Sequence, residues 1–221
     1  MIKDISVVLL GAGKSKRFDT NTLKQNVKIH DKRVIDYSVD FFRKHFNVSK
    51  KYFVINKKIQ LKTLTENEHI LYGSTSRLKS LNNCLDYISR NNLQTKYLLV
   101  HDVARPVLNL ADIKKIIREI HKKVDGSTLG YPLTNAVKEV KNNTIYYNIH
   151  KSNLWSTFTP QIFKMEKLYQ SVKACLDEKY DVDDDIEALL LNSLKCSMIM
   201  SSPTNIKVTY KSDINYIKKL L

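Results

Sequence analysis

The stretch 5–10 reads Ile-Ser-Val-Val-Leu-Leu and runs directly into Gly11-Ala12-Gly13-Lys14-Ser15-Lys16-Arg17. A short apolar run rich in β-branched residues predicts a buried strand. The loop after it combines glycines, which let backbone N–H groups approach an anion, with cations that neutralise the charge of that anion. The stretch therefore predicts a phosphate-binding turn. It lacks the spacing of a Walker A loop and the third glycine of the dinucleotide fingerprint, so an ordinary strand-to-helix turn with a solvated basic edge is the alternative.

Segments with strand and helix patterns alternate after this loop. We expect further strands at 51–55, 68–71, 96–100, 127–131, 196–200 and 205–208, and helices at 34–46, 110–123, 164–178, 183–194 and 212–221. A further helix is expected after Gly73, capped by Ser74 or Thr75, with Leu78, Leu81, Leu85 and Ile88 on one face. This alternation predicts an α/β fold with a Rossmann-like, doubly wound and mostly parallel sheet.

One part of the chain departs from this rhythm. Two short alternating runs, 136–140 and 145–149, are separated by Lys141-Asn142-Asn143-Thr144. This pattern predicts a β-hairpin, although Asn-Asn is a weaker turn signal than Asn-Gly. We expect a protruding arm at about 134–153 that covers a site or reaches a partner.

Composition narrows the class of protein. The chain has 221 residues, 43% of them hydrophobic, which suits a single α/β domain over 1–221. Its net charge of +15 comes from lysines dispersed over most expected helices, so we expect a solvated basic surface that attracts a polyanionic small substrate, and no nucleic-acid partner. No apolar run reaches 18 residues, which predicts no membrane-spanning helix.

The cysteines and the first residues of the chain indicate the cellular compartment. Cys84, Cys175 and Cys196 are far apart and lack metal-ligand spacing, so we expect reduced core thiols. The first residues, 1–4, lead directly into the first strand, so we expect no secretory signal and a cytoplasmic protein.

A second candidate site follows the strand expected at 96–100, where the sequence reads His101-Asp102-Val103-Ala104-Arg105-Pro106. Ligands of open parallel sheets bind at the carboxyl ends of strands. Asp102 is therefore a candidate Mg²⁺ ligand, and Arg105 a candidate for binding phosphate or positioning Asp102. The alternative is an aspartate that caps the loop and pairs with its own arginine. We interpret His101 as a packed turn residue.

Two further motifs lie near the C-terminal end. Phe158-Thr159-Pro160-Gln161-Ile162-Phe163 precedes an expected helix, and Pro160 can start that helix. Lys207 falls within the strand expected at 205–208. A lysine in an apolar strand costs free energy unless its amine points into a polar site, although edge strands also carry lysines.

The order and spacing of these motifs resemble one family over nearly the whole chain. Strand–GxG–basic loop–Lys24-Gln25, His-Asp-x-Ala-Arg-Pro, Thr-Pro-Gln-x-Phe and Asn-Ile-Lys-Val-Thr together are similar to the 2-C-methyl-D-erythritol 4-phosphate cytidylyltransferases and their relatives, the ribitol-5-phosphate cytidylyltransferases. The resemblance implies a fold of the nucleotide-diphospho-sugar transferase type. It also implies a Mg²⁺-dependent enzyme that transfers CMP from CTP to a phosphorylated polyol, and a homodimer formed through the hairpin arm.

The resemblance also assigns site residues. The implied catalytic residues are Arg17, Lys24 and Lys207. The implied nucleotide-binding residues are Gly11, Ala12, Gly13, Gly73, Ser80, Asp102 and Arg105, with Asp102 as the metal ligand. The implied acceptor-binding residues are Thr134, Lys151, Thr159 and Lys207. Such a set works by positioning and charge neutralisation, because a phosphate monoester is already a nucleophile and needs no general base.

Several positions differ from the family's pattern. In the first loop and before the last motif, this chain has Ser15, Phe18, Leu23 and Thr204 where glycine, methionine, proline and an acidic residue are usual. In the arm, Ala136 replaces a threonine and Lys151 an arginine, and a lysine holds a phosphate without the bidentate fork. Thr134 lies near enough to substitute for the threonine if the register shifts.

The acceptor best supported by the sequence is 2-C-methyl-D-erythritol 4-phosphate, used in isoprenoid precursor synthesis. Ribitol 5-phosphate or another sugar phosphate, used for surface polysaccharide, is the alternative. A weakened nucleotide-binding relative and a basic nucleic-acid-binding protein are more distant alternatives.

Overall fold

A computed structural model describes residues 4–15, 17–19, 21–46, 49–62 and 64–221. The loop cation Lys16 and the first three residues of the expected N-terminus lie outside these ranges. The strands are β1 (Ile5–Gly11), β2 (Lys28–Ile29), β3 (Lys32–Arg33), β4 (Lys51–Ile55), β5 (Glu68–Tyr72), β6 (Tyr97–Asp102), β7 (Gly126–Pro132), β8 (Val137–Lys141), β9 (Thr144–Ile149), β10 (Trp155–Lys164) and β11 (Cys196–Met200). The helices are α1 (Val34–His45), α2 (Arg77–Arg90), α3 (Leu110–Glu119), α4 (Met165–Asp177), α5 (Asp185–Leu191), α6 (Asp213–Lys218) and the short 3-10 helix η1 (Lys24–Asn26).

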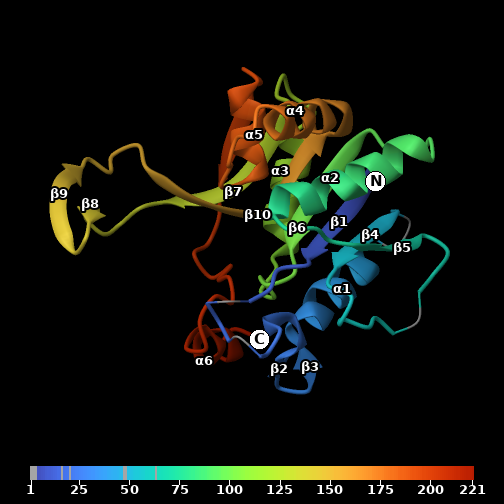
Figure 1. The fold of residues 1–221 in the computed structure, drawn as a ribbon, viewed down its shortest axis with the longest axis horizontal. Coiled ribbons are helices and arrows are strands. Elements are labelled where there is room, and N and C mark those ends of the chain that lie inside the picture. The colour runs from blue at the N-terminus through green and yellow to red at the C-terminus, as the bar shows by residue number, and fades with distance from the viewer. Residues whose placement is uncertain (1–3, 16, 20, 47–48, 63) are drawn as a thin grey trace.

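A seven-stranded sheet in the order β11-β7-β10-β6-β1-β4-β5 forms the centre of the molecule (Figure 1). All neighbouring pairs are parallel except those of β10, which runs antiparallel to both β6 and β7. Helices cover both faces of this sheet. The predicted doubly wound, mostly parallel α/β fold is confirmed.

The alternation of side chains along each strand separates the core into two layers. On one face, Val7 and Leu9 of β1 pack with α1 and α3, and on the other face Val8 and Leu10 pack with α2, α4 and α5. All seven residues of β1 are buried, which is typical of a central parallel strand covered on both faces. This burial fixes the position of the loop that leaves β1.

Two sequence expectations about the C-terminal half are wrong. Pro160 does not start a helix: it lies within β10, at an irregularity where the pairing with β7 shifts between Phe158 and Gln161. A proline has no N–H to donate, and such an irregularity tolerates it. The segment 205–208 is not a strand, because its pairing to the body is limited to contacts such as Val208 N–H to the carbonyl of Ala104.

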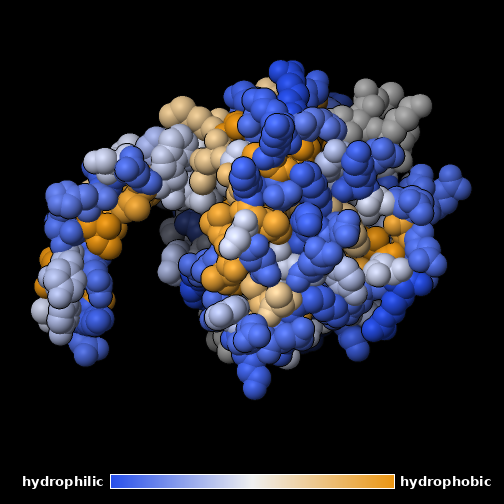
Figure 2. Space-filling model, turned by 90° about the horizontal axis from the view of Figure 1, so that it is seen from above, coloured by the Kyte–Doolittle hydropathy of each residue, from blue (hydrophilic) through white to orange (hydrophobic). Residues whose placement is uncertain are grey.

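The hairpin is confirmed and extends away from the body as an arm (Figure 1). Asn142 and Asn143 connect β8 to β9 with φ angles of 48° and 62°. Positive φ at both central residues is the signature of a type I′ turn, which asparagine tolerates better than most residues. The arm stands clear of the globular part, and hydrophobic side chains are visible along it (Figure 2).

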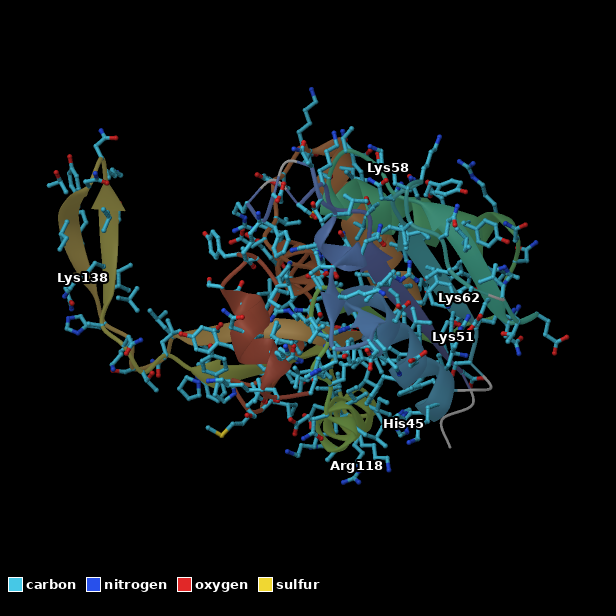
Figure 3. All side chains as sticks on the ribbon, turned by 90° about the horizontal axis from the view of Figure 1, so that it is seen from below. His45, Lys51, Lys58, Lys62, Arg118 and Lys138 are labelled. Atoms are coloured by element: carbon cyan, nitrogen blue, oxygen red, sulfur yellow. The ribbon has the colours of Figure 1, made fainter. Side chains whose placement is uncertain are left out.

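The basic surface is scattered. Lys58, Arg118 and Lys138 lie on widely separated edges of the molecule in Figure 3. In the described part of the chain, no helix is both long and apolar enough to span a membrane.

Candidate active site

The glycine loop after β1 is held in shape by Gln25. Its side-chain amide Nε2 donates to the carbonyls of Gly11 and Gly13, at 2.9 and 3.0 Å, and the side chain is buried. Ser15 adds two contacts, donating from Oγ to Gln25 Oε1 and accepting the backbone N–H of Lys24. Hydrogen bonds within the protein therefore hold the loop in shape. In the sequence, Gln25 was part of the Lys24-Gln25 motif, but no role was predicted for it.

Ser15 stands where the family's pattern has glycine, and the backbone conformation at this position explains why glycine is usual there. Its φ angle of 58° lies in the left-handed region, which favours glycine. The two hydrogen bonds of its hydroxyl to Gln25 and Lys24 stabilise this conformation.

A second loop, after β5, packs directly on the first. A Cβ atom added to Gly73 would lie 2.0 Å from Cβ of Ala12, so glycine is required for this approach. The hydroxyl of Ser80 accepts the backbone N–H of Ser74 at 2.9 Å and donates to the carbonyl of Ser76 at 2.7 Å. Gly73 and Ser80 thus shape the second loop. Their contact with cytosine and ribose stays a prediction.

A cavity of about 280 Å³ lies between these loops and the end of β6. Seven of the predicted site residues line it: Ala12, Gly13, Arg17, Lys24, Ser80, Asp102 and Lys207. They come from segments far apart in the sequence, whereas Gly11 and Gly73 do not belong to the described lining. The lining also includes Arg77 and Thr209, which the sequence analysis did not single out.

Asp102 is the carboxylate of this cavity and is nearly buried. Arg77 donates from Nε to Oδ1 at 3.1 Å, and Lys207 donates from Nζ to Oδ2 at 2.6 Å. Burial alone would raise the pKa of Asp102, but the positive charges of Arg77, Lys207 and Arg105 hold it well below its usual range. Asp102 is therefore ionised, and Lys207 points into a polar site.

Lys24 lies in η1 and donates from Nζ to the carbonyl of Val208 at 2.5 Å. Burial, together with the positive charges of Lys207 and Arg17, lowers the pKa of this amine to about 8, although Asp102 acts in the opposite direction. A triphosphate bound next to Lys24 would favour its charged form.

Arg105 and Thr159 do not belong to the described lining of the cavity. The guanidinium of Arg105 donates to the carbonyl of Asn205 at 2.8 Å and lies 5.6 Å from the ring centre of Phe158. The hydroxyl of Thr159 accepts the backbone N–H of Asp102 at 2.9 Å. Both residues support the loop that carries Asp102, and their direct contact with a ligand stays a prediction.

His101 is packed, as expected. Its ring is fully buried, and burial lowers its pKa to about 3, so it is neutral. Thr159 Oγ1 lies 3.1 Å from Nδ1 of this ring, and the carbonyl of Arg105 lies 3.1 Å from Nε2. A neutral ring in this position donates from Nε2 to the carbonyl and accepts the threonine hydroxyl at Nδ1.

Thr134 and Lys151 lie at the base of the arm, away from the lining of the cavity. Nζ of Lys151 donates to the carbonyl of Thr134. Thr134 is exposed and Lys151 is half-buried, while Ala136 is also exposed. Within one chain, these arm residues therefore do not reach the cavity.

The residues of the cavity fit a hard divalent cation. Mg²⁺ is commonly bound by one or two carboxylates together with substrate phosphates and water. Asp102 is an ionised carboxylate of this kind, whereas Thr204 is exposed and lies outside the cavity lining. The described residues contain no cluster of three or more His, Cys, Asp or Glu side chains that could hold a metal without a substrate.

The arrangement is suited to handling phosphates. Among the described residues, the cavity is lined by one carboxylate, Asp102, and by five cationic side chains: Lys14, Arg17, Lys24, Arg77 and Lys207. Such a site stabilises negative charge and orients phosphate groups.

A comparison with protein families supports this interpretation. The model described as "IspD: 2-C-methyl-D-erythritol 4-phosphate cytidylyltransferase" matches residues 5–221. Among curated proteins, the enzyme of that name from Wigglesworthia glossinidia brevipalpis is 29% identical over 218 residues, covering 96% of this chain and 93% of the relative. The enzyme from Buchnera aphidicola is 26% identical over 217 residues, covering 95% and 90%.

Solved structures share the fold. The Francisella tularensis 2-C-methyl-D-erythritol 4-phosphate cytidylyltransferase superposes with a TM-score of 0.87 at 22% identity, covering 99% of this chain and 100% of the other. The Thermus thermophilus enzyme gives a TM-score of 0.81 at 15% identity, covering 98% of both chains.

Proposed function

This chain belongs to the family of 2-C-methyl-D-erythritol 4-phosphate cytidylyltransferases, and from that premise we propose that it transfers CMP from CTP to 2-C-methyl-D-erythritol 4-phosphate and releases pyrophosphate. The observation that carries the proposal is the cavity in which Lys24, Asp102 and Lys207 meet. Family members are CTP-dependent nucleotidyltransferases. The chain acts as one nucleotidyltransferase domain over 1–221.

The reaction is a direct transfer between phosphates. An oxygen of the acceptor phosphate attacks the α-phosphorus of CTP, the bond from this phosphorus to the bridging oxygen breaks, and pyrophosphate leaves. Arg17 and Lys24 neutralise the charge that develops at the α-phosphate, and Lys207 orients the reacting phosphate. No proton has to be removed from the nucleophile, which agrees with a neutral, buried His101 that takes no part.

The nucleotide half of the site is formed by the two packed loops. Gly11, Ala12 and Gly13 present backbone N–H groups to the triphosphate, while Gly73 and Ser80 hold the loop beside cytosine and ribose. Arg105 supports the nucleotide side from behind Asp102, through its bond to the carbonyl of Asn205.

Mg²⁺ is the proposed cofactor, with Asp102 as its protein ligand. When bound, such an ion neutralises and orients the triphosphate. Asp102 would contribute an ionised carboxylate at the end of β6, and Lys207, which contacts the same carboxylate at 2.6 Å, would share it with the ion.

The acceptor half is completed by the arm of a second copy. Thr134 and Lys151 belong to the arm and lie outside the cavity of their own chain, which supports a homodimer in which each arm serves the partner's site. Thr159 and Lys207 approach the acceptor from the body. The exposed Ile145, Tyr146 and Tyr147 supply apolar contacts for this dimer. A monomeric wild type at micromolar concentration in sedimentation velocity would contradict it.

The activity is tested by pyrophosphate release from CTP and Mg²⁺ with a panel of acceptors: methylerythritol phosphate, ribitol phosphate, glycerol phosphate and sugar phosphates. We expect the highest kcat/KM with methylerythritol phosphate. A preference for ribitol phosphate would favour the second candidate, for which the specific observation is the changed arm, with Ala136 and Lys151 in place of threonine and arginine. No release above background with any acceptor would overturn the proposal.

The cytoplasm is the proposed location. Its support is chemical, because Cys84, Cys175 and Cys196 are all free thiols, two of them buried, as is common in a reducing compartment. Fractionation of cells that produce the protein tests this point.

A further inference from the structure

Arg77 occupies a position that helix stability does not explain. It is the first residue of α2, directly after the N-cap Ser76, and no acidic residue lies in the first turn of this helix. A positive charge at this end opposes the helix dipole. The guanidinium instead contacts two carboxylates from other elements, Asp102 at the end of β6 and Asp185 at the start of α5.

The contact with Asp185 is the stronger of the two. Nη1 and Nη2 of Arg77 donate to Oδ1 and Oδ2 of Asp185 at 2.5 and 2.9 Å, a bidentate arrangement. The side chain of Asp185 has no solvent exposure. Burial raises the pKa of Asp185 and is opposed by the charge of Arg77, while the two carboxylates raise the pKa of Arg77 far above its ordinary value. Arg77 therefore always carries its charge.

The start of α5 is itself fixed to the sheet. The neighbouring Asp184 accepts hydrogen bonds from Thr157 and Gln161 of β10, both at 2.9 Å, and caps the helix through the N–H of Glu187. Asp185 is thus a rigid anchor. Because a guanidinium is planar, fixing its two Nη atoms also fixes the direction of its Nε–H.

That Nε–H points at Oδ1 of Asp102. The other oxygen, Oδ2, faces Lys207, a cation of the cavity. We propose that Arg77, held by Asp185, is a positioning residue that fixes the carboxylate of Asp102 with Oδ2 directed to the cations of the nucleotide site. The inference rests on the proposed function, since it concerns how Asp102 serves the metal–CTP complex. Outer partners that orient a ligand in this way are commonly important for metal affinity.

The chain offers a matched control for a purely structural role. Arg43 and Glu68 form a second bidentate pair, with distances of 2.9 and 2.7 Å. Exposure is nearly the same in the two pairs, 30% and 0% for Arg43 and Glu68, and 28% and 0% for Arg77 and Asp185. Neither Arg43 nor Glu68 lines the cavity. Glu68→Gln therefore removes a comparable buried carboxylate away from the site.

The experiment measures CTP binding by isothermal titration calorimetry, with and without Mg²⁺ and without acceptor. The quantity compared is the factor by which Mg²⁺ tightens CTP binding. We expect Asp185→Asn to reduce this factor by roughly tenfold or more. Arg77→Lys, which keeps the charge but loses the fork, should reduce it similarly and replaces Asp185→Asn if that variant does not fold. Glu68→Gln should match the wild type, even where its melting temperature falls.

A double-mutant cycle separates positioning from a general effect of charge. In an Asp102→Asn background, Asp185→Asn should cause no further loss, because its effect passes through Asp102. An additive loss, or a folded variant with the wild-type factor, would overturn the inference and leave the proposed function intact. If Mg²⁺ does not tighten CTP binding to the wild type, the proposed metal role fails first and the inference fails with it.

Discussion

The nucleotide cavity and the arm are built in opposite ways. Around the cavity, Gln25, Asp102 and Ser80 are buried and hydrogen-bonded, Gln25 and Ser80 to nearby loops and Asp102 to the distant Thr159. Along the arm, every residue from Val140 to His150 is exposed. The first region is complete within one chain, whereas the second has an ordered backbone and few contacts for its side chains.

This difference separates two requirements of the proposed reaction. A triphosphate needs a rigid set of cations and N–H groups, which a folded core supplies at no cost on binding. The acceptor, the second substrate, is proposed to bind at a different position from the triphosphate, and its identity is a separate question. The departures from the family's pattern at Ala136 and Lys151 lie in the arm. Because Ala136 is exposed and Lys151 is half-buried, we expect changes at these two positions to alter the stability of the fold little.

The largest expected effect is on stability. Phe53 of β4 is fully buried in the core, so Phe53→Ala should reduce the free energy of unfolding by about 3–5 kcal/mol. Tyr147→Ala in the arm, where the side chain is 65% exposed, should change it by no more than about 0.5 kcal/mol. Urea unfolding followed by circular dichroism, at concentrations where the protein is monomeric, measures both. Equal losses would mean that the arm is part of the cooperative core.

Lys24 tests the nucleotide side directly. Lys24→Ala should reduce the rate of pyrophosphate release by about 100- to 1,000-fold, because the amine is proposed to neutralise charge that develops in the transition state. The matched control is Lys28→Ala, an exposed lysine of β2 close in sequence. Circular dichroism should be unchanged in both variants. A near-normal rate for Lys24→Ala would show that the catalytic residues are wrongly assigned.

Much of the nucleotide cavity was predictable from the sequence because its signals are local. The strand 5–10, its glycine loop and the position of Asp102 follow from short apolar runs and the residues directly after them. The hairpin was predictable for the same reason, since alternation and Asn142-Asn143 occur within one short segment.

The features that the sequence did not predict depend on contacts between residues far apart in the chain. β10 carries Pro160, and a proline just before an expected helix resembles a helix start. The pairing of β10 with two strands that precede it in the chain cannot be seen in this local pattern. The pairing of Arg77 with Asp185 joins residues far apart in the sequence, so no local pattern indicated it. Lys207 was assigned to the site by the resemblance, in spite of a wrong strand assignment. Its chemistry alone left two interpretations open, because a lysine among apolar neighbours either points into a polar site or lies on an edge strand.

The arm is tested by Lys151. Lys151→Ala should raise the KM for the acceptor by about 10- to 100-fold, the value of a charge-assisted hydrogen bond to phosphate, and leave the Kd for CTP unchanged. Lys138→Ala, on the same arm (Figure 3), is the control. Lys151→Arg should keep the KM low. A weaker affinity for CTP in Lys151→Ala would contradict the separation of the two regions.

The smallest expected effect is a pH dependence confined to the nucleotide region. Burial and neighbouring cations lower the pKa of Lys24 to about 8, so its amine is mostly charged at pH 7 and mostly neutral at pH 9 in the free protein. Binding of CTP favours the charged form, so the Kd for CTP should rise by about tenfold between these two pH values. Fluorescence or calorimetric titration measures this change.

Lys24→Arg supplies the control for that titration, because arginine keeps its charge throughout this range. Its Kd for CTP should vary little between pH 7 and 9. A wild-type Kd that stays constant, or an arginine variant with the same rise, would assign the pH dependence to another group. The contribution of Lys151 to acceptor binding should not change with the protonation of Lys24, since Lys151 lies outside the cavity that lowers this pKa.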